Sequence, residues 1–157
     1  FHWMSIGYSA STIGLILLAF TLSGVAAIIV SPFFEKRIGI KNVFYISLVS
    51  VAPLGLMFYL SGGKGILGII SVVLIGFVSF FAVPVNMSLA QRLMPDLKSI
   101  ISGFIGGFSW GIIGLLLPLI SKFSELVGIL PILLIMTMIP TVFSYFIKYL
   151  PEESDIA

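Results

Sequence analysis

The sequence predicts an all-α integral membrane protein with about five transmembrane helices. Hydrophobic residues make up 59% of the 157-residue chain, whereas soluble domains contain about 45–50%. Charged residues make up only 9%, against roughly a quarter in soluble domains. The mean hydropathy of +1.24 leaves too few polar groups to cover the surface of a water-soluble fold. The lipid bilayer is therefore the expected surroundings of this chain.

The same composition argues against several other classes of protein. The formal net charge is +2 at pH 7, but the basic residues are scattered between apolar runs and form no patch for nucleic acid. The chain has no cysteine, so disulfides and thiolate metal sites are absent. His2 is the only histidine and has no carboxylate beside it, so we expect no enzyme, no metal site and no cofactor.

Five stretches have the length that crosses about 30 Å of hydrocarbon, roughly 20 residues of α-helix. They are residues 11–34, 43–60, 66–93, 99–120 and 129–149. Short segments rich in charge, glycine or proline separate them, at residues 35–42, 61–65, 94–98 and 121–128. We therefore expect one compact bundle over residues 1–157, with neighbouring helices antiparallel and a polar, acidic tail at 151–157.

Small residues recur at every fourth position in the first and fourth spans. Residues four apart share one helix face, so another helix backbone can come close to these stripes. Helix packing is one interpretation, and faces that slide during a conformational cycle are the other. The stripes are Ala19, Ser23, Ala27 and Ser31 in the first span, and Gly103, Gly107 and Gly111 in the fourth.

Prolines lie inside the second to fifth spans, where each removes a backbone hydrogen bond and bends its helix. Such kinks are structural, or they belong to a protein that moves or encloses a cavity. No charged residue lies near the middle of any span, so the chain has no visible proton-coupling site. The prolines are Pro53, Pro84, Pro118 and Pro140.

Uncharged polar residues mark one face of the third and fourth spans. Ser79 and Asn86 are seven residues apart, as are Ser102 and Ser109, with Trp110 beside the last. Seven residues are close to two helical turns, so each pair shares a face. These side chains either join helices by hydrogen bonds or line a pathway for a solute.

The basic residues predict an orientation, because short cytoplasmic loops carry an excess of lysine and arginine. We expect the N-terminus outside and the C-terminal tail in the cytoplasm. Six basic residues then lie on the cytoplasmic side and two on the other. They are Lys36, Arg37, Lys41, Arg92, Lys98 and Lys148, against Lys64 and Lys122.

The segment from residue 91 to residue 114 reads QRLMPDLKSIISGFIGGFSWGIIG. It resembles the junction between helices ten and eleven of the major facilitator superfamily, in particular of the fosmidomycin-resistance type of efflux permease. The loop with Arg37, Gly39 and Lys41 is similar, in degraded form, to the loop between helices eight and nine of that family. In this register Lys36 stands where the family has an acidic residue, and Pro32 stands at the first glycine.

The resemblance covers nearly the whole chain and implies helices eight to twelve, the C-terminal half of such a transporter. It also implies a partner, the N-terminal half, and helices eight, ten and eleven around a central cavity. The expected location is a prokaryotic inner membrane. We expect efflux of a small organic solute past Ser79, Asn86, Ser102, Ser109 and Trp110. The alternative is a five-span structural or assembly subunit with no transport path.

Overall fold

The computed structural model describes residues 2–150, and the regular elements of this part of the chain are all helices. A short helix, α1 (His2–Ser5), comes first. The prediction of an all-α fold with about five spanning helices is confirmed, and the predicted tail at 151–157 lies outside the described residues. The five segments long and apolar enough to cross a membrane are α2 (Ala10–Ile38), α3 (Ile40–Leu60), α4 with α5 (Gly65–Phe81 and Val83–Leu93), η1 with α6 (Pro95–Leu97 and Lys98–Val127), and α7 with η2 (Ile129–Phe143 and Ser144–Tyr149).

Two connections are much shorter than the predicted loops at 35–42 and 121–128. A single glycine joins α2 to α3 and another joins α6 to α7, namely Gly39 with φ 81° and Gly128 with φ 86°. Glycine adopts positive φ without steric cost, so it can end one helix and begin the next. The polar residues of the predicted loops therefore lie in helix ends. A helix of 29 residues, as α2 is, is about 43 Å long and extends beyond a hydrocarbon layer of about 30 Å.

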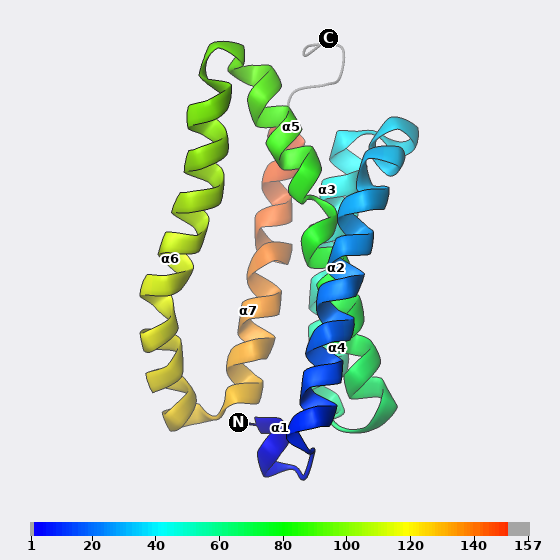
Figure 1. Ribbon diagram of the computed structural model, residues 1–157, viewed down its shortest axis with the longest axis vertical. Helices are drawn as coiled ribbons and strands as arrows, with labels where there is room; N and C mark the ends of the chain where they lie inside the picture. Colours follow the sequence, from blue (N-terminus) through cyan, green and yellow to red (C-terminus); the bar gives the residue numbers. More distant parts are fainter. Residues whose placement is uncertain (1, 151–157) are drawn as a thin grey trace.

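The third predicted span, 66–93, is interrupted once, between α4 and α5. Pro84 stands in the first turn of α5 and has no backbone N–H to give to the carbonyl of Phe80. That carbonyl accepts a hydrogen bond from the backbone N–H of Ala82 instead. Because of this break, α5 follows α4 at an angle, as Figure 1 shows.

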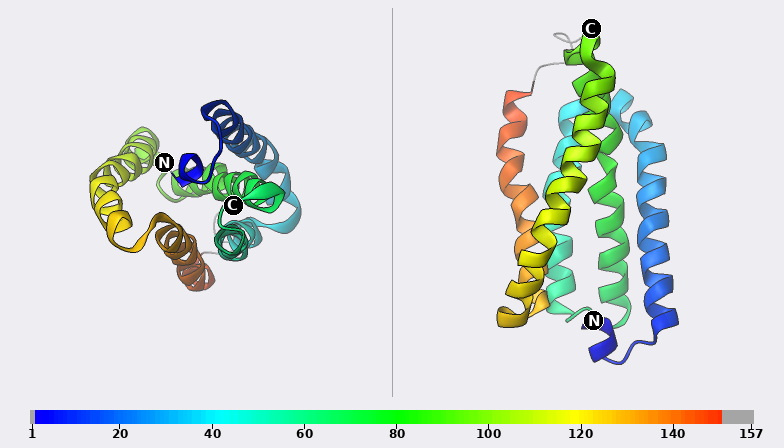
Figure 2. Two further views of the ribbon diagram at one scale, coloured as in Figure 1. Left: turned by 90° about the horizontal axis from the view of Figure 1, so that it is seen from below. Right: turned by 60° about the vertical axis from the view of Figure 1, so that its left-hand side comes forward.

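Helices α2, α3 and α4 form the closely packed part of the molecule, and α7 packs against α3 (Figure 1). Helix α6 stands apart from α2, α3 and α4 in Figure 1 and in the view from below in Figure 2, and it has no buried residue. The main cluster of buried side chains lies where α2, α3, α4 and α5 meet. It contains Ala27, Ile40, Val43, Phe81, Ala82, Val85 and Leu89.

The helix connections gather at two opposite ends of the bundle. Helix α1, the turn at residues 61–65 and the α6–α7 junction lie at one end in Figure 1. The α2–α3 and α5–α6 junctions and the end of η2 lie at the other. This second end carries the six basic residues that the sequence assigns to the cytoplasm.

Candidate functional site

Three hydroxyl groups join helices by donating to a backbone carbonyl of a neighbouring helix. The single hydroxyl hydrogen of Ser23 in α2 is shared between the carbonyl of Val73 in α4 and that of Phe20 in its own helix, both at 2.7 Å. Ser47 of α3 donates to Val78 in α4, at 2.6 Å, and Thr141 of α7 donates to Leu48 in α3, at 3.0 Å. Each of these side chains is buried or partly buried. Such bonds satisfy polar atoms that lipid cannot.

Ser102, one of the predicted pathway residues, also serves a contact between helices. Its Oγ accepts a hydrogen bond from Nε2 of Gln91 at 2.8 Å and donates to the carbonyl of Lys98 at 2.8 Å. Gln91 belongs to α5 and Ser102 to α6, so this pair holds the two helices together near the η1 turn. Of the two interpretations that the sequence left open, this geometry fits hydrogen bonding between helices.

The other four predicted pathway residues lie on exposed surfaces and make no contact of this kind. The side chains of Ser79, Asn86, Ser109 and Trp110 are all exposed, and Trp110 is 70% exposed. None of the four makes a side-chain hydrogen bond to another residue of the described part of the chain. These groups face lipid, water or another protein, and a polar side chain in lipid is unfavourable.

The first small-residue stripe lies at the contact between α2 and α4. Ala27 and Ser31 are fully buried, Ala19 and Ser23 are partly buried, and a Cβ added at Gly76 would stand 2.6 Å from the carbonyl oxygen of Phe20. Backbone and side chains therefore approach closely here, as small residues permit.

The glycine stripe of the fourth span behaves differently. A Cβ added at Gly103, Gly107 or Gly111 would meet no described atom within 4 Å. Among residues 2–150 this stripe is therefore no contact between helices, because α6 stands apart from α2, α3 and α4 and its contacts with α5 and α7 involve other residues. Glycines at which an added Cβ would come within 3.0 Å of a neighbouring atom lie elsewhere, and they are Gly24, Gly55, Gly63, Gly68 and Gly76.

Some contact residues were not singled out from the sequence, although their spacing carries a signal. Ser47 and Gly55 are eight apart on α3, and both are buried. Thr137 and Thr141 are four apart on α7, and a Cβ on Gly55 would clash with the side chain of Thr137. The four-residue spacing of the first stripe thus also marks the α7 side of the α3–α7 contact, where Thr137 meets Gly55 and Thr141 donates to Leu48. Ser47 faces α4 instead.

The motif of Arg37, Gly39 and Lys41, which the sequence predicts on the cytoplasmic side, falls at the α2–α3 junction. Arg37 is exposed, and Gly39 is the connecting residue. The acidic residue of this region, Glu35, forms an ion pair with Arg92 at the end of α5, at 3.1 Å. Arg92 is 49% exposed, so the pair links two helix ends but contributes little stability.

No group of three or more histidine, aspartate or glutamate side chains that could hold a metal ion occurs among residues 2–150. Comparison with protein-family models, with curated proteins and with solved structures found no match to this chain. Residues 2–150 thus form an all-helical bundle with five helices long and apolar enough to cross a membrane.

Proposed function

We propose that this chain is part of a secondary transporter that carries a small organic solute across the membrane. The observation that supports the proposal is the contrast between two sets of polar residues. Ser23, Ser47 and Thr141 donate across helix contacts, whereas Ser79 and Asn86 are exposed on α4 and α5. Exposed polar groups on a spanning helix fit a water-accessible path, because lipid would leave them without partners.

The uncovered helix α6 fits the same proposal. Ser109 and Trp110 are exposed on it, together with the open glycine stripe at Gly103, Gly107 and Gly111. A second set of helices would cover this face and close the path. In the proposal that set is the N-terminal half of a major facilitator transporter, and residues 2–150 supply helices eight to twelve. The basis for this assignment is the sequence resemblance of residues 91–114 and of the loop with Arg37, Gly39 and Lys41.

Export from the cytoplasm of a prokaryote, across its inner membrane, is the direction and place that the resemblance to efflux permeases favours. An uncharged surface that includes Trp110 would select solutes loosely and by their apolar parts. Since no charged residue lies mid-span in this chain, proton coupling would come from the other half.

The alternative, a structural or assembly subunit, makes a different prediction about water. Because the chain has no natural cysteine, single cysteines can be placed at Ser79, Asn86 and Ser47 and treated in native membranes with a membrane-impermeant thiol reagent. We expect labelling at Ser79→Cys and Asn86→Cys and none at Ser47→Cys, which is buried. If Ser79→Cys and Asn86→Cys are as unreactive as Ser47→Cys, the pathway is disproved and the structural subunit is favoured.

A further inference from the structure

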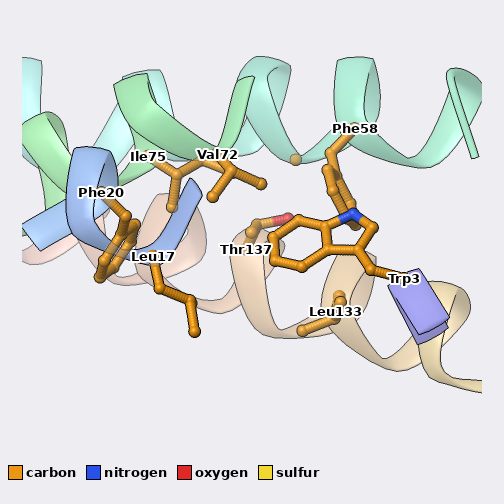
Figure 3. Close-up of a pocket in the computed structure, with 9 residues that line it drawn as sticks. Trp3, Leu17, Phe20, Phe58, Val72, Ile75, Leu133 and Thr137 are labelled. Carbon is orange, nitrogen blue, oxygen red and sulfur yellow. The ribbon is translucent and has the colours of Figure 1, made fainter. Parts of the chain in front are cut away.

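A half-open cavity of about 250 Å³ lies between α2, α3, α4 and α7, beside α1, and one of its lining residues, Leu17, is 52% exposed. Aromatic and aliphatic side chains form its wall, and no polar atom is exposed on it. Figure 3 shows these side chains around the cavity, with Trp3 at the α1 end. Among the lining residues only Thr137 has a hydroxyl, and it donates to the carbonyl of Leu134 in its own helix at 2.8 Å. The lining residues used below are Trp3, Phe58, Val72, Ile75 and Leu133.

Helix α1 is attached firmly at this end of the cavity. Nε1 of Trp3 donates to the carbonyl of Gly63 at 3.1 Å, and Nε2 of His2 lies 2.9 Å from the carbonyl oxygen of Gly62. The indole of Trp3 also meets the ring of Phe58 edge-on, with centroids 6.2 Å apart. The Trp3 ring is therefore a fixed part of the wall, with its one polar atom turned to the backbone.

The size and chemistry of the cavity select the kind of group that fits. An enclosed apolar cavity of about 150 Å³ binds benzene, so this half-open cavity of about 250 Å³ has room for one aromatic ring with a few more carbons. A charged or hydrogen-bonding group would find no partner on this wall and would lose its hydration. The aromatic walls suit edge-to-face contact with a ring.

The cavity adjoins the polar face of α4. Val72 and Ile75 line it, and Ser79 is seven residues beyond Val72 and four beyond Ile75, on the same helix face. An amphipathic molecule could therefore place its ring between Val72 and Trp3 while a polar group extends toward Ser79.

We propose that this cavity is a binding site for the uncharged, ring-sized apolar part of the transported solute. The binding of an apolar ring is argued from the cavity alone. That the molecule carrying this ring is transported rests on the proposed function. The same hydrocarbon chemistry occurs in lipid acyl chains, so the experiment must separate a free solute from a lipid.

Bromobenzene is a suitable probe, because bromine quenches tryptophan fluorescence at short range. The chain has two tryptophans, and Trp110→Phe leaves Trp3 as the only one. In vesicles of unbrominated phosphatidylcholine, we expect bromobenzene to quench Trp3 along a saturating curve. Quenching that rises linearly with bromobenzene concentration would mean partition into lipid alone and would overturn the proposal.

Val72→Phe fills the cavity and should raise the half-quenching concentration by about tenfold or more, because even one methylene in an apolar pocket is worth roughly 10–200-fold in selectivity. Leu133→Phe fills it from α7 and keeps the test decisive if the first variant does not fold. The matched control is Val49→Phe, on an exposed position of α3 outside the cavity, which should leave the curve unchanged. Equal curves for all the folded variants would contradict the site.

Vesicles of phosphatidylcholine brominated on its acyl chains provide the second arm. We expect weak quenching of Trp3 that Val72→Phe does not alter. Strong quenching that Val72→Phe removes would show that an acyl chain occupies the cavity, and it would overturn the assignment to a free solute. Neither arm measures transport, so failure here is separate from failure of the cysteine labelling at Ser79 and Asn86.

Discussion

Two serine hydroxyl groups, at positions 47 and 79, have different surroundings in this protein. Ser47 is buried and donates to Val78 at 2.6 Å, next to the helix break before α5. Ser79 has the same side chain on an exposed face of α4. The two serines therefore form a natural pair for separating stability from function.

Ser47→Ala should lower the free energy of unfolding by about 0.6 kcal/mol, and at most by about 2 kcal/mol, as for other hydrogen bonds between membrane helices. Ser79→Ala should leave it unchanged, because its hydroxyl makes no bond to a described residue. Unfolding in mixed micelles with increasing dodecyl sulfate measures both. A loss in Ser79→Ala as large as that in Ser47→Ala would contradict the assignment of the two roles.

Glycine positions allow the same comparison for packing. A side chain at Gly55 would clash with Thr137, whereas a Cβ at Gly107 meets no described atom within 4 Å. Gly55→Leu should therefore destabilise the chain by about 1–3 kcal/mol, the usual cost of overpacking. Gly107→Leu should be neutral or slightly stabilising, since leucine favours helix over glycine. Thermal denaturation in detergent tests this, and equal midpoints for the two variants would refute it.

Sequence spacing predicted where small residues occur but not which neighbour they meet. Ala27 and Ser31 are buried against other helices, while Gly103 and Gly107 have an equally regular spacing and no neighbour within 4 Å. Periodicity identifies a helix face, but the partner of that face depends on how distant helices are arranged. That arrangement is set by contacts such as Gly55 with Thr137, which join residues far apart in the chain.

At the scale of elements, apolar length predicted the five spanning helices well, and the helix ends poorly. Charged residues such as Glu35 and Lys36 suggested a loop, yet α2 continues through both. Their side chains are compatible with a helix that has left the hydrocarbon, so charge marks the membrane surface rather than the helix end. Gly39, with its positive φ, is the residue that ends the helix.

Helix α1 is the element that the sequence described least. Its position depends on side chains that reach a turn about 60 residues away in the chain. Trp3 donates to the carbonyl of Gly63, and the His2 ring nitrogen lies next to the carbonyl of Gly62. The phenol oxygen of Tyr8 also accepts from the backbone N–H of Gly65 at 2.9 Å. No pattern in the neighbouring sequence predicts a contact between residues so far apart in the chain.

Trp3→Ala should release α1, because it removes both the bond to Gly63 and the ring contact with Phe58. Hydrogen exchange read by mass spectrometry should then show faster exchange in α1 and in the turn at residues 61–65. Trp110→Ala removes the same side chain from an exposed position and should change neither segment. Unchanged exchange in Trp3→Ala would show that α1 is held by something else.

At the scale of the whole molecule, the bundle is packed unevenly and charged unevenly. Helices α2, α3 and α4 share close contacts, whereas α6 has no buried residue. The end with the α2–α3 and α5–α6 junctions carries most of the basic residues (Figure 1). The expected orientation, with the basic end in the cytoplasm, would account for the uneven charge. The proposed path beside α6 would account for the exposed helix.

The sidedness of single cysteines tests this arrangement most directly. Lys98 lies at the basic end, Lys64 and Lys122 lie at the opposite end, and all three are exposed. In intact cells and in inverted membrane vesicles, we expect an impermeant thiol reagent to label Lys98→Cys only from the cytoplasmic side. Lys64→Cys and Lys122→Cys should react only from outside. Labelling of all three positions from one side, or with the sides reversed, would contradict the five-span topology or its orientation.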